Sequence, residues 1–490
     1  MLDVDAIGAL APKRWNDAAL VLDEAAPSWP HSRKVRTVAV FYYRMGTGGA
    51  ERVTRDLMTL WIALGYHVVF FCDEPDEGEP SDSVEYRLPE GVELETLPSC
   101  LSSQGDTYGA RAHALHRALE AHNVDSLVYC QWLAPTLPWD LLVARELGIS
   151  FIVHTHGTFL VLGCYGIPDL LELPSCYRHA NGVVCLSRAD YEFWSSYCSR
   201  VYETANPSPR EMLGNPPASL CGHRILWVGR VSDDKYPTEV VPVMRKVVEA
   251  IPDATLSMVG PVDARLGEIL ASQIAEAGLS GHIVLEGGKT EDEMPAVYQG
   301  ADIFLSTSHL EGWSLALAEA MASGLPVAMY DLSYLTLLKG ERGIRSSSVG
   351  DTAALARAVI EILSDDVLRR DLGTDARAYL EELDGFDAAG LWARVFAECS
   401  PQLRETAEEE SSCALLAAWD AVSFGARELV VENRSLRVQF DACQERVCAL
   451  EQENDAIRQN LLRVTGSVSF RVGRVLTAPA RKLRDAMRGE

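Results

Sequence analysis

The sequence predicts an α/β protein in which two doubly wound domains face a cleft and a C-terminal coiled coil follows. Three observations support this prediction. Short apolar runs alternate with segments of helical spacing, first over residues 35–205 and again over residues 217–385. Residues 206–216, rich in Pro and Asn, separate the two series as a linker. Apolar residues then fall into a heptad repeat over residues 429–464.

The composition excludes several classes of protein. The chain has 490 residues, 48% hydrophobic and 23% charged, which is globular composition and enough for two or three domains. Its formal net charge of −26 disfavours nucleic acid as a general partner, because phosphates would be repelled. The chain does not open on a basic segment followed by an apolar run, and no stretch approaches about 18 uncharged apolar residues. We therefore expect neither a secretory signal nor a transmembrane helix.

The cysteines indicate a reducing compartment. Twelve of them are scattered along the chain, and none has the paired spacing of a metal or redox motif. This pattern favours free thiols in a reducing cytoplasm and gives no support to a zinc site.

The first α/β series begins after an irregular N-terminal extension, residues 1–34. VRTVAVFYY is a predicted buried strand, and MGTGGA after it is a predicted glycine-rich loop. ERVTRDLMTLWIALG is then a predicted amphipathic helix, and HVVFFC is the next predicted strand. This strand–loop–helix–strand unit is the building block of a parallel, Rossmann-like sheet. SLVYC, FIVHTH and GVVCLS are further predicted strands, with helical patterns at about 108–122, 137–148 and 187–198.

The second series contains five apolar runs: RILWVG, ATLSMVG, HIVLEG, DIFLSTS and PVAMY. Helical segments separate most of them, at 238–250, 263–277, 291–299 and 314–323. Residues 386–403 are expected to form a helix that returns to the N-terminal domain, and residues 404–428 an acidic hinge. Parallel sheets of this kind bind ligands at the carboxyl ends of their strands, so the cleft between the two domains is the predicted site.

The segment HLEGWSLALAEAMASGLPV, residues 309–327, carries two glutamates eight positions apart, Glu311 and Glu319. That spacing predicts both carboxylates near one face of a helix. Gly312 stands at the expected helix start, where backbone N–H groups suit a phosphate, and Glu319 can accept hydrogen bonds from a ribose diol. The alternative is two solvated glutamates on an amphipathic helix. It fits less well because this helix is otherwise almost wholly apolar.

Two cations, Arg230 and Lys235, directly follow a predicted strand in the segment ILWVGRVSDDKYP. At the carboxyl end of a strand they can neutralise a diphosphate leaving group. Taken alone, two basic loop residues are more often ordinary surface charge. Their expected placement opposite the segment of Glu311 and Glu319 favours the functional interpretation.

These two segments, with GTGGAER near the N-terminus, resemble the retaining GT-B glycosyltransferases that carry an E-x7-E motif, the group 1 or family 4 type. That family includes mannosyl- and N-acetylglucosaminyltransferases of lipopolysaccharide and capsule synthesis, and the resemblance spans about residues 36–398. It implies retaining transfer of a hexosyl or N-acetylhexosaminyl group from a nucleotide-sugar donor to a cell-envelope glycan or lipid-linked acceptor. It also implies that no cofactor and no metal is required.

The resemblance assigns roles to individual residues. Glu311 would contact the donor sugar and Glu319 the ribose, while Arg230 and Lys235 hold the diphosphate. His156, in HTHG, matches a histidine near the donor sugar. The remaining donor-binding positions implied are Gly48, Gly49, Gly312, Trp313, Ser314 and Leu315.

Two departures from the family pattern leave the sugar pocket and the hinge open. Trp313 is bulkier than the residue many members carry, and the familiar Asn-Gly after the first domain is Asn206-Pro207 here. The pair His154 and His156 could suggest a metal. No third ligand is evident near them in the sequence, so we predict none.

Two other functions stay open on the sequence. A nucleotide-sugar epimerase shares this architecture and would act without an acceptor. A non-catalytic scaffold would bind a nucleotide sugar and work through its coiled coil, although it would not need all four charged groups. The donor base, the sugar and the acceptor are also left open.

The C-terminal segments predict partners. Asn433 and Asn454 lie at a positions of the heptads, which favours a parallel homodimer through residues 429–464 over a helix packed on the core. The tail, residues 465–490, is basic and has one apolar helical face. It suits the anionic inner face of the plasma membrane as a peripheral anchor, and folding back onto the acidic core is the alternative.

Overall fold

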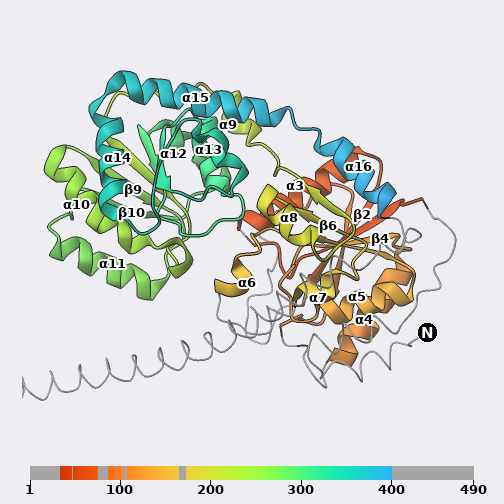
Figure 1. The fold of residues 1–490 in the computed structure, drawn as a ribbon. Helices are drawn as coiled ribbons and strands as arrows, with labels where there is room; N and C mark the ends of the chain where they lie inside the picture. Colours follow the sequence, from red (N-terminus) through yellow and green to blue (C-terminus); the bar gives the residue numbers. More distant parts are fainter. Residues whose placement is uncertain are drawn as a thin grey trace, which may run out of the picture. The chain divides into compact units, whose positions relative to one another are not determined.

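A computed structural model describes residues 34–46, 48–74, 87–101, 103, 108–164 and 173–399. Over these residues the chain builds two α/β domains, each on a parallel sheet (Figure 1). The prediction of two doubly wound, Rossmann-like domains is confirmed. The acidic hinge, the coiled coil and the basic tail lie outside the described residues, as do nearly all of residues 1–34.

The N-terminal sheet has seven strands in the order β3-β2-β1-β4-β5-β6-β7, and every neighbouring pair is parallel. The strands are β1 Thr37–Phe41, β2 His67–Asp73, β3 Val92–Leu97, β4 Ser126–Tyr129, β5 Ser150–His154, β6 Gly182–Cys185 and β7 Val201–Glu203. Its helices are α3 Gly49–Ala63, α4 Tyr108–Ala121, α5 Leu137–Glu146, α6 Val161–Cys164, α7 Leu173–Tyr177 and α8 Arg188–Ser195. The strand order reverses between β1 and β4, which is where sheets of this topology bind ligands.

The second sheet has six parallel strands in the order β10-β9-β8-β11-β12-β13. They are β8 Arg224–Val228, β9 Thr255–Val259, β10 Ile283–Gly287, β11 Ile303–Leu305, β12 Val327–Tyr330 and β13 Ile344–Ser347. The helices are α9 Arg210–Gly214, α10 Val240–Ala250, α11 Ala264–Glu276, α12 Met294–Gln299, α13 Leu315–Ala322, α14 Thr352–Ser364 and α15 Asp366–Asp384. Short 3-10 turns are η3 Asp233–Lys235, η4 Pro237–Glu239, η5 Glu291–Glu293 and η6 Thr336–Glu341.

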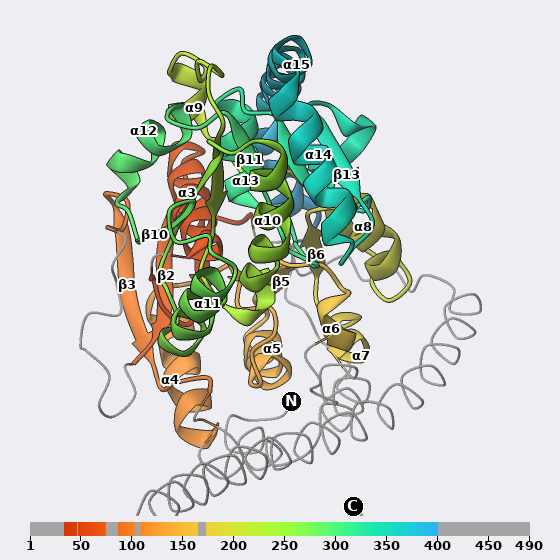
Figure 2. The same ribbon diagram turned by 90° about the vertical axis from the view of Figure 1, so that its left-hand side faces the viewer.

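Helices cover both faces of the second sheet, so its central strands β8, β11 and β12 are apolar on both sides. Alternate residues of β8 enter different cores. Ile225 and Trp227 pack with α10, α11 and α14, which lie on one face (Figure 2), whereas Leu226 packs with α12 and α13. The reversal of strand order falls between β8 and β11, so the loops after these two strands meet.

The last described helix, α16 Ala388–Glu398, belongs to the N-terminal core and lies beside α3 (Figure 1). The ring of Trp392 packs edge-on against Trp61 with centroids 4.9 Å apart, and the Ser150 hydroxyl donates to the Cys399 carbonyl over 2.6 Å. The chain therefore crosses from the second domain back to the first. Within the part of the chain that the structure describes, no helix is long and apolar enough to span a bilayer.

Removing the Trp392 ring tests this crossing. Trp392→Ala is expected to lower the free energy of unfolding by about 3–5 kcal/mol, because the ring is fully buried and its loss leaves a cavity against α3. Phe386→Ala is the control, since Phe386 precedes the same helix and is 40% exposed, and its cost should stay within about 0.5 kcal/mol. Chemical denaturation followed by circular dichroism measures both. Equal losses would mean that α16 is not part of the core.

Candidate functional site

A cavity of about 690 Å³ opens where the reversal points of the two sheets face each other. Its walls come from the loop after β1, the loops after β8 and β9, and the segment between β11 and α13. Every site residue predicted from the sequence lines it: Gly48, Gly49, His156, Arg230, Lys235, Glu311, Gly312, Trp313, Ser314, Leu315 and Glu319. Sequence reasoning missed others on the same walls, among them Arg52, Pro261, Lys289, Thr290 and Glu291.

Two glycines, Gly229 and Gly260, bring two loops of the cavity wall together. Gly260, after β9, has a φ of +144°, and a Cβ there would lie 2.0 Å from the carbonyl oxygen of Gly229. Only glycine fits, and the two loops can therefore touch backbone to backbone. Arg230, which follows Gly229, is exposed and lines the cavity.

Lys235 and Glu311 form an ion pair inside the cavity, with Nζ 2.7 Å from Oε1. Lys235 ends the turn η3, and its carbonyl oxygen accepts a hydrogen bond from the Thr307 hydroxyl over 3.0 Å. The Tyr334 hydroxyl fixes Glu311 by accepting from its backbone N–H and donating to its carbonyl, both over 3.1 Å. The carboxylate thus has a defined position beside the cation.

The predicted helix start needs correction. Ser314 takes a left-handed φ of +67° and caps α13, which begins at Leu315. Glu311 therefore lies in the preceding loop and does not share a helix face with Glu319. The loop passes so close to the N-terminal domain that a Cβ on Gly312 would lie 2.6 Å from the His156 carbonyl oxygen.

Glu319 is 4% exposed, and protein donors satisfy both of its carboxylate oxygens. The Tyr298 hydroxyl donates to Oε2 over 2.6 Å, and the Arg52 guanidinium pairs with Oε1. Burial, followed by the charge of Glu319, raises the pKa of Tyr298 well above its ordinary value. A buried carboxylate requires such partners, and one of them comes from the other domain.

A second arginine of α3 makes a comparable contact nearer the solvent. Arg55 donates two hydrogen bonds to Glu291, over 2.9 and 3.0 Å, in a bidentate pair. This contact lowers the pKa of Glu291 below its ordinary value. In the sequence, Arg52 and Arg55 are polar residues of a predicted amphipathic helix. Only the tertiary structure shows that they form ion pairs with the second domain.

The histidine pair lies on the N-terminal wall. His154 ends β5 and is buried, whereas His156 faces the cavity, and Nδ1 of His154 lies 3.2 Å from Nε2 of His156. Burial lowers the pKa of His156 to about 3 and that of His154 well below its ordinary value, so both rings are neutral near pH 7. The sequence showed no third ligand, but the fold brings one. Cys130, which follows β4, offers a sulfur that completes a set of ligand atoms within 4.8 Å of one another.

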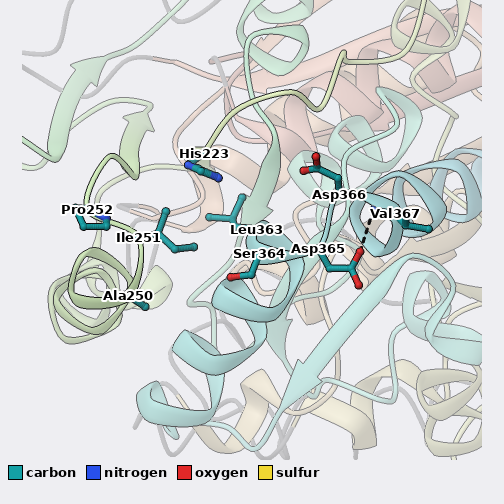
Figure 3. Close-up of a pocket in the computed structure, with 9 residues that line it drawn as sticks. All are labelled: His223, Ala250, Ile251, Pro252, Leu363, Ser364, Asp365, Asp366 and Val367. Atoms are coloured by element: carbon teal, nitrogen blue, oxygen red, sulfur yellow. Dashed lines mark hydrogen bonds between the residues drawn. The ribbon is translucent and has the colours of Figure 1, made fainter.

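Another hollow lies on the second domain, and most of its polar side chains make contacts within that domain (Figure 3). Its volume is about 570 Å³ and it lies between the ends of α10 and α14. Asp365 accepts from the backbone N–H groups of Val367 and Leu368, and so caps α15. Asp366 pairs with Arg369, and His223 with Asp253. These groups serve local structure, and the chemistry belongs to the cavity between the sheets.

Two family models match the chain. The model described as Glycosyl transferases group 1 matches residues 222–379, and the model described as Glycosyl transferase 4-like domain matches residues 48–193. The residues predicted to act lie within these two matches.

Two curated relatives illustrate the similarity. A 2-deoxystreptamine glucosyltransferase of Streptomyces kanamyceticus is 31% identical over 172 residues, which are 35% of this chain and 44% of the relative. A GDP-mannose:cellobiosyl-diphosphopolyprenol alpha-mannosyltransferase of Xanthomonas oryzae pv. oryzae is 28% identical over 228 residues, 45% of this chain and 58% of the relative. The chain spans about half the length of these curated relatives.

Solved structures resemble the chain over most of the described residues. Sucrose-phosphate synthase from Thermosynechococcus elongatus has a TM-score of 0.61 at 18% identity, covering 74% of this chain and 99% of that structure. Anabaena Alr3699/HepE in complex with UDP and glucose has a TM-score of 0.58 at 16% identity, covering 75% of this chain and all of that structure. At such identities the likeness concerns the fold, which is the predicted GT-B arrangement.

The two arginines of α3 make a matched pair of tests. Arg52→Ala is expected to lower the free energy of unfolding by about 1–3 kcal/mol, because the buried Glu319 carboxylate keeps only Tyr298 as a donor. Arg55→Ala removes the same charge from the same helix, but its partner Glu291 is 40% exposed, so about 1 kcal/mol or less is expected. Chemical denaturation gives both values. A larger loss for Arg55→Ala would contradict the importance of the buried pair.

Proposed function

Because the chain combines a glycosyl transferase 4-like domain with a domain of the group 1 glycosyl transferases, we propose that it is a retaining glycosyltransferase. It transfers a hexosyl or N-acetylhexosaminyl group from a nucleotide-sugar donor to a cell-envelope glycan or a lipid-linked acceptor. One observation carries the proposal: two cations, Arg230 and Lys235, and two carboxylates, Glu311 and Glu319, line a single cavity.

The arrangement suits the departure of a diphosphate. As the glycosidic bond breaks, negative charge grows on the leaving phosphate, and Arg230 and Lys235 stabilise it. Glu311 orients the donor sugar, and Glu319 receives the ribose hydroxyls. The acceptor hydroxyl attacks from the face that the diphosphate leaves, which retains configuration without a protein nucleophile. In this scheme the side chains supply the positive charge, so the proposal includes no metal or cofactor.

The sugar class follows from the relatives. The two curated relatives described above are a glucosyltransferase and a GDP-mannose-dependent mannosyltransferase, which supports transfer of a hexose. The latter carries a diphosphopolyprenol acceptor in its name, which supports a lipid-linked acceptor here. Analysis of products from a panel of nucleotide sugars separates this function from that of an epimerase, which releases an altered sugar without an acceptor, and from that of a scaffold, which binds the donor and releases nothing.

Substitutions in the cavity test the assigned roles. Lys235→Gln and Arg230→Gln are each expected to lower kcat about 10²- to 10³-fold with little change in acceptor KM, because the charge they stabilise is greatest in the transition state. Glu319→Ala should instead weaken nucleotide binding, measured by calorimetry. Glu268→Ala, an exposed carboxylate of α11, is the control and should change neither quantity. A loss confined to acceptor KM would contradict the diphosphate role.

The C-terminal segments supply a separate prediction. We propose that residues 429–464 form a homodimer and that residues 465–490 attach it to the inner face of the plasma membrane. Light scattering should show a dimer for the full chain and for a chain ending at 464, and a monomer for a chain ending at 428. On sedimentation with anionic vesicles only the full chain should pellet with them. Each basic side chain near the membrane surface contributes roughly 1 kcal/mol to binding. A full chain that stays in the supernatant would indicate that the tail does not bind membranes.

A further inference from the structure

Three side chains that ligate soft metal ions meet on the N-terminal wall of the cavity. Cys130 directly follows β4, and His154 ends the neighbouring strand β5, which pairs with β4 in parallel. His156 lies in the bend just beyond β5. With one ligand atom taken from each residue, all three atoms lie within 4.8 Å of one another. The sheet therefore assembles a set of two imidazoles and one thiol that no local spacing reveals.

The separations suit a tetrahedral ion. Zinc binds nitrogen at about 2.0–2.1 Å and sulfur at about 2.3 Å, which places neighbouring ligand atoms about 3.3–3.6 Å apart. Nδ1 of His154 and Nε2 of His156 are already 3.2 Å apart. The Cys130 sulfur lies within 4.8 Å of a nitrogen of each histidine, so it has to move closer to them when an ion binds. The two ring nitrogens thus need almost no rearrangement to share one ion.

Hydrogen bonding leaves this cluster incomplete. The two rings share one hydrogen bond, and among the described residues the buried Nε2 of His154 has no partner. His154 is 1% exposed and Cys130 is fully buried, so solvent water does not reach their side chains. An ion between the facing nitrogens replaces the single hydrogen bond between the rings with a bond to each ring, and it leaves Nε2 of His154 as it is.

The ligand types and the access route select the ion. A thiolate with two imidazoles suits Zn²⁺ and its chemical relatives, whereas Mg²⁺, Ca²⁺ and Mn²⁺ prefer oxygen, and this set contains no carboxylate. His156 lines the cavity, so an ion can enter from there. Three protein ligands leave the fourth position of a tetrahedral ion for water. An open position of this kind separates the cluster from a closed structural zinc site.

We infer that Cys130, His154 and His156 form a binding site for Zn²⁺ on the wall of the cavity. The ion replaces the proton of the Cys130 thiol, which is released to solvent. It bonds to the facing nitrogens of the two histidines, and the ring that donates the hydrogen bond between them transfers that proton to its other nitrogen. Because His156 then points at the ion, zinc competes with a ligand that needs this ring in the cavity. The competition with a sugar donor rests on the proposed transferase function, but binding of the ion does not.

Cobalt titration of the full-length protein tests the site, because Co²⁺ substitutes for zinc and is visible by absorption. The expected spectrum has the bands of a tetrahedral ion together with a thiolate-to-cobalt charge-transfer band, and one equivalent of Zn²⁺ should abolish both. Cys130→Ser should lose the charge-transfer band. Cys221→Ser removes an exposed thiol of the second domain and should keep it.

His156→Gln provides a second variant should Cys130→Ser fail to fold. It should weaken zinc affinity about ten-fold or more in equilibrium dialysis, with an unchanged circular dichroism spectrum. A cobalt complex without the charge-transfer band, or one that Cys130→Ser leaves intact, would overturn the site. In transfer assays zinc should raise the apparent KM for the donor in Cys221→Ser as in the parent protein. An absence of transfer without zinc would refute the transferase proposal, while the cobalt spectrum would still decide the site.

Discussion

The buried carboxylate of Glu319 is a contact point between the two domains. A charge at 4% exposure needs donors, and it takes one from Tyr298 of its own domain and one from Arg52 of the other. The same contact fixes how α3 faces the second sheet. In the proposed reaction a ribose diol binds the same carboxylate, so Arg52 lies beside the ribose position.

The topology of the second sheet turns distant sequence positions into one site. β8 and β11 are paired neighbours at the reversal of strand order, so the loops that follow them converge. Lys235 and Glu311 are 76 positions apart in the chain and 2.7 Å apart in space for this reason. The same logic operates in the first sheet, where β4 and β5 bring Cys130 to His154. Parallel sheets concentrate chemistry at one edge, whether or not a given cluster serves the main reaction.

The sequence predicted the central strands and one edge strand, β10, but missed the other three edge strands. β3, β7 and β13, which end their sheets, had no apolar run to identify them. β3 exposes Glu93, Leu94 and Thr96, and β13 has the polar sequence IRSS. An edge strand has only one neighbour and a partly solvated surface, so its side chains need not be hydrophobic. Central strands are covered on both faces and therefore appear in the sequence as continuous apolar runs.

The site residues show the same division between local and distant information. The predicted site residues all line the cavity, and each was found from a motif that is a local stretch of sequence. Arg52, Tyr298 and Cys130 went unnoticed because their partners are far away in the chain. One local inference was also wrong: helical spacing put Glu311 on a helix, but Gly312 passes within van der Waals contact of the His156 backbone and Ser314 turns left-handed before α13 begins. Contact between the domains overrides helical periodicity there, at the point where the proposed donor sugar would lie.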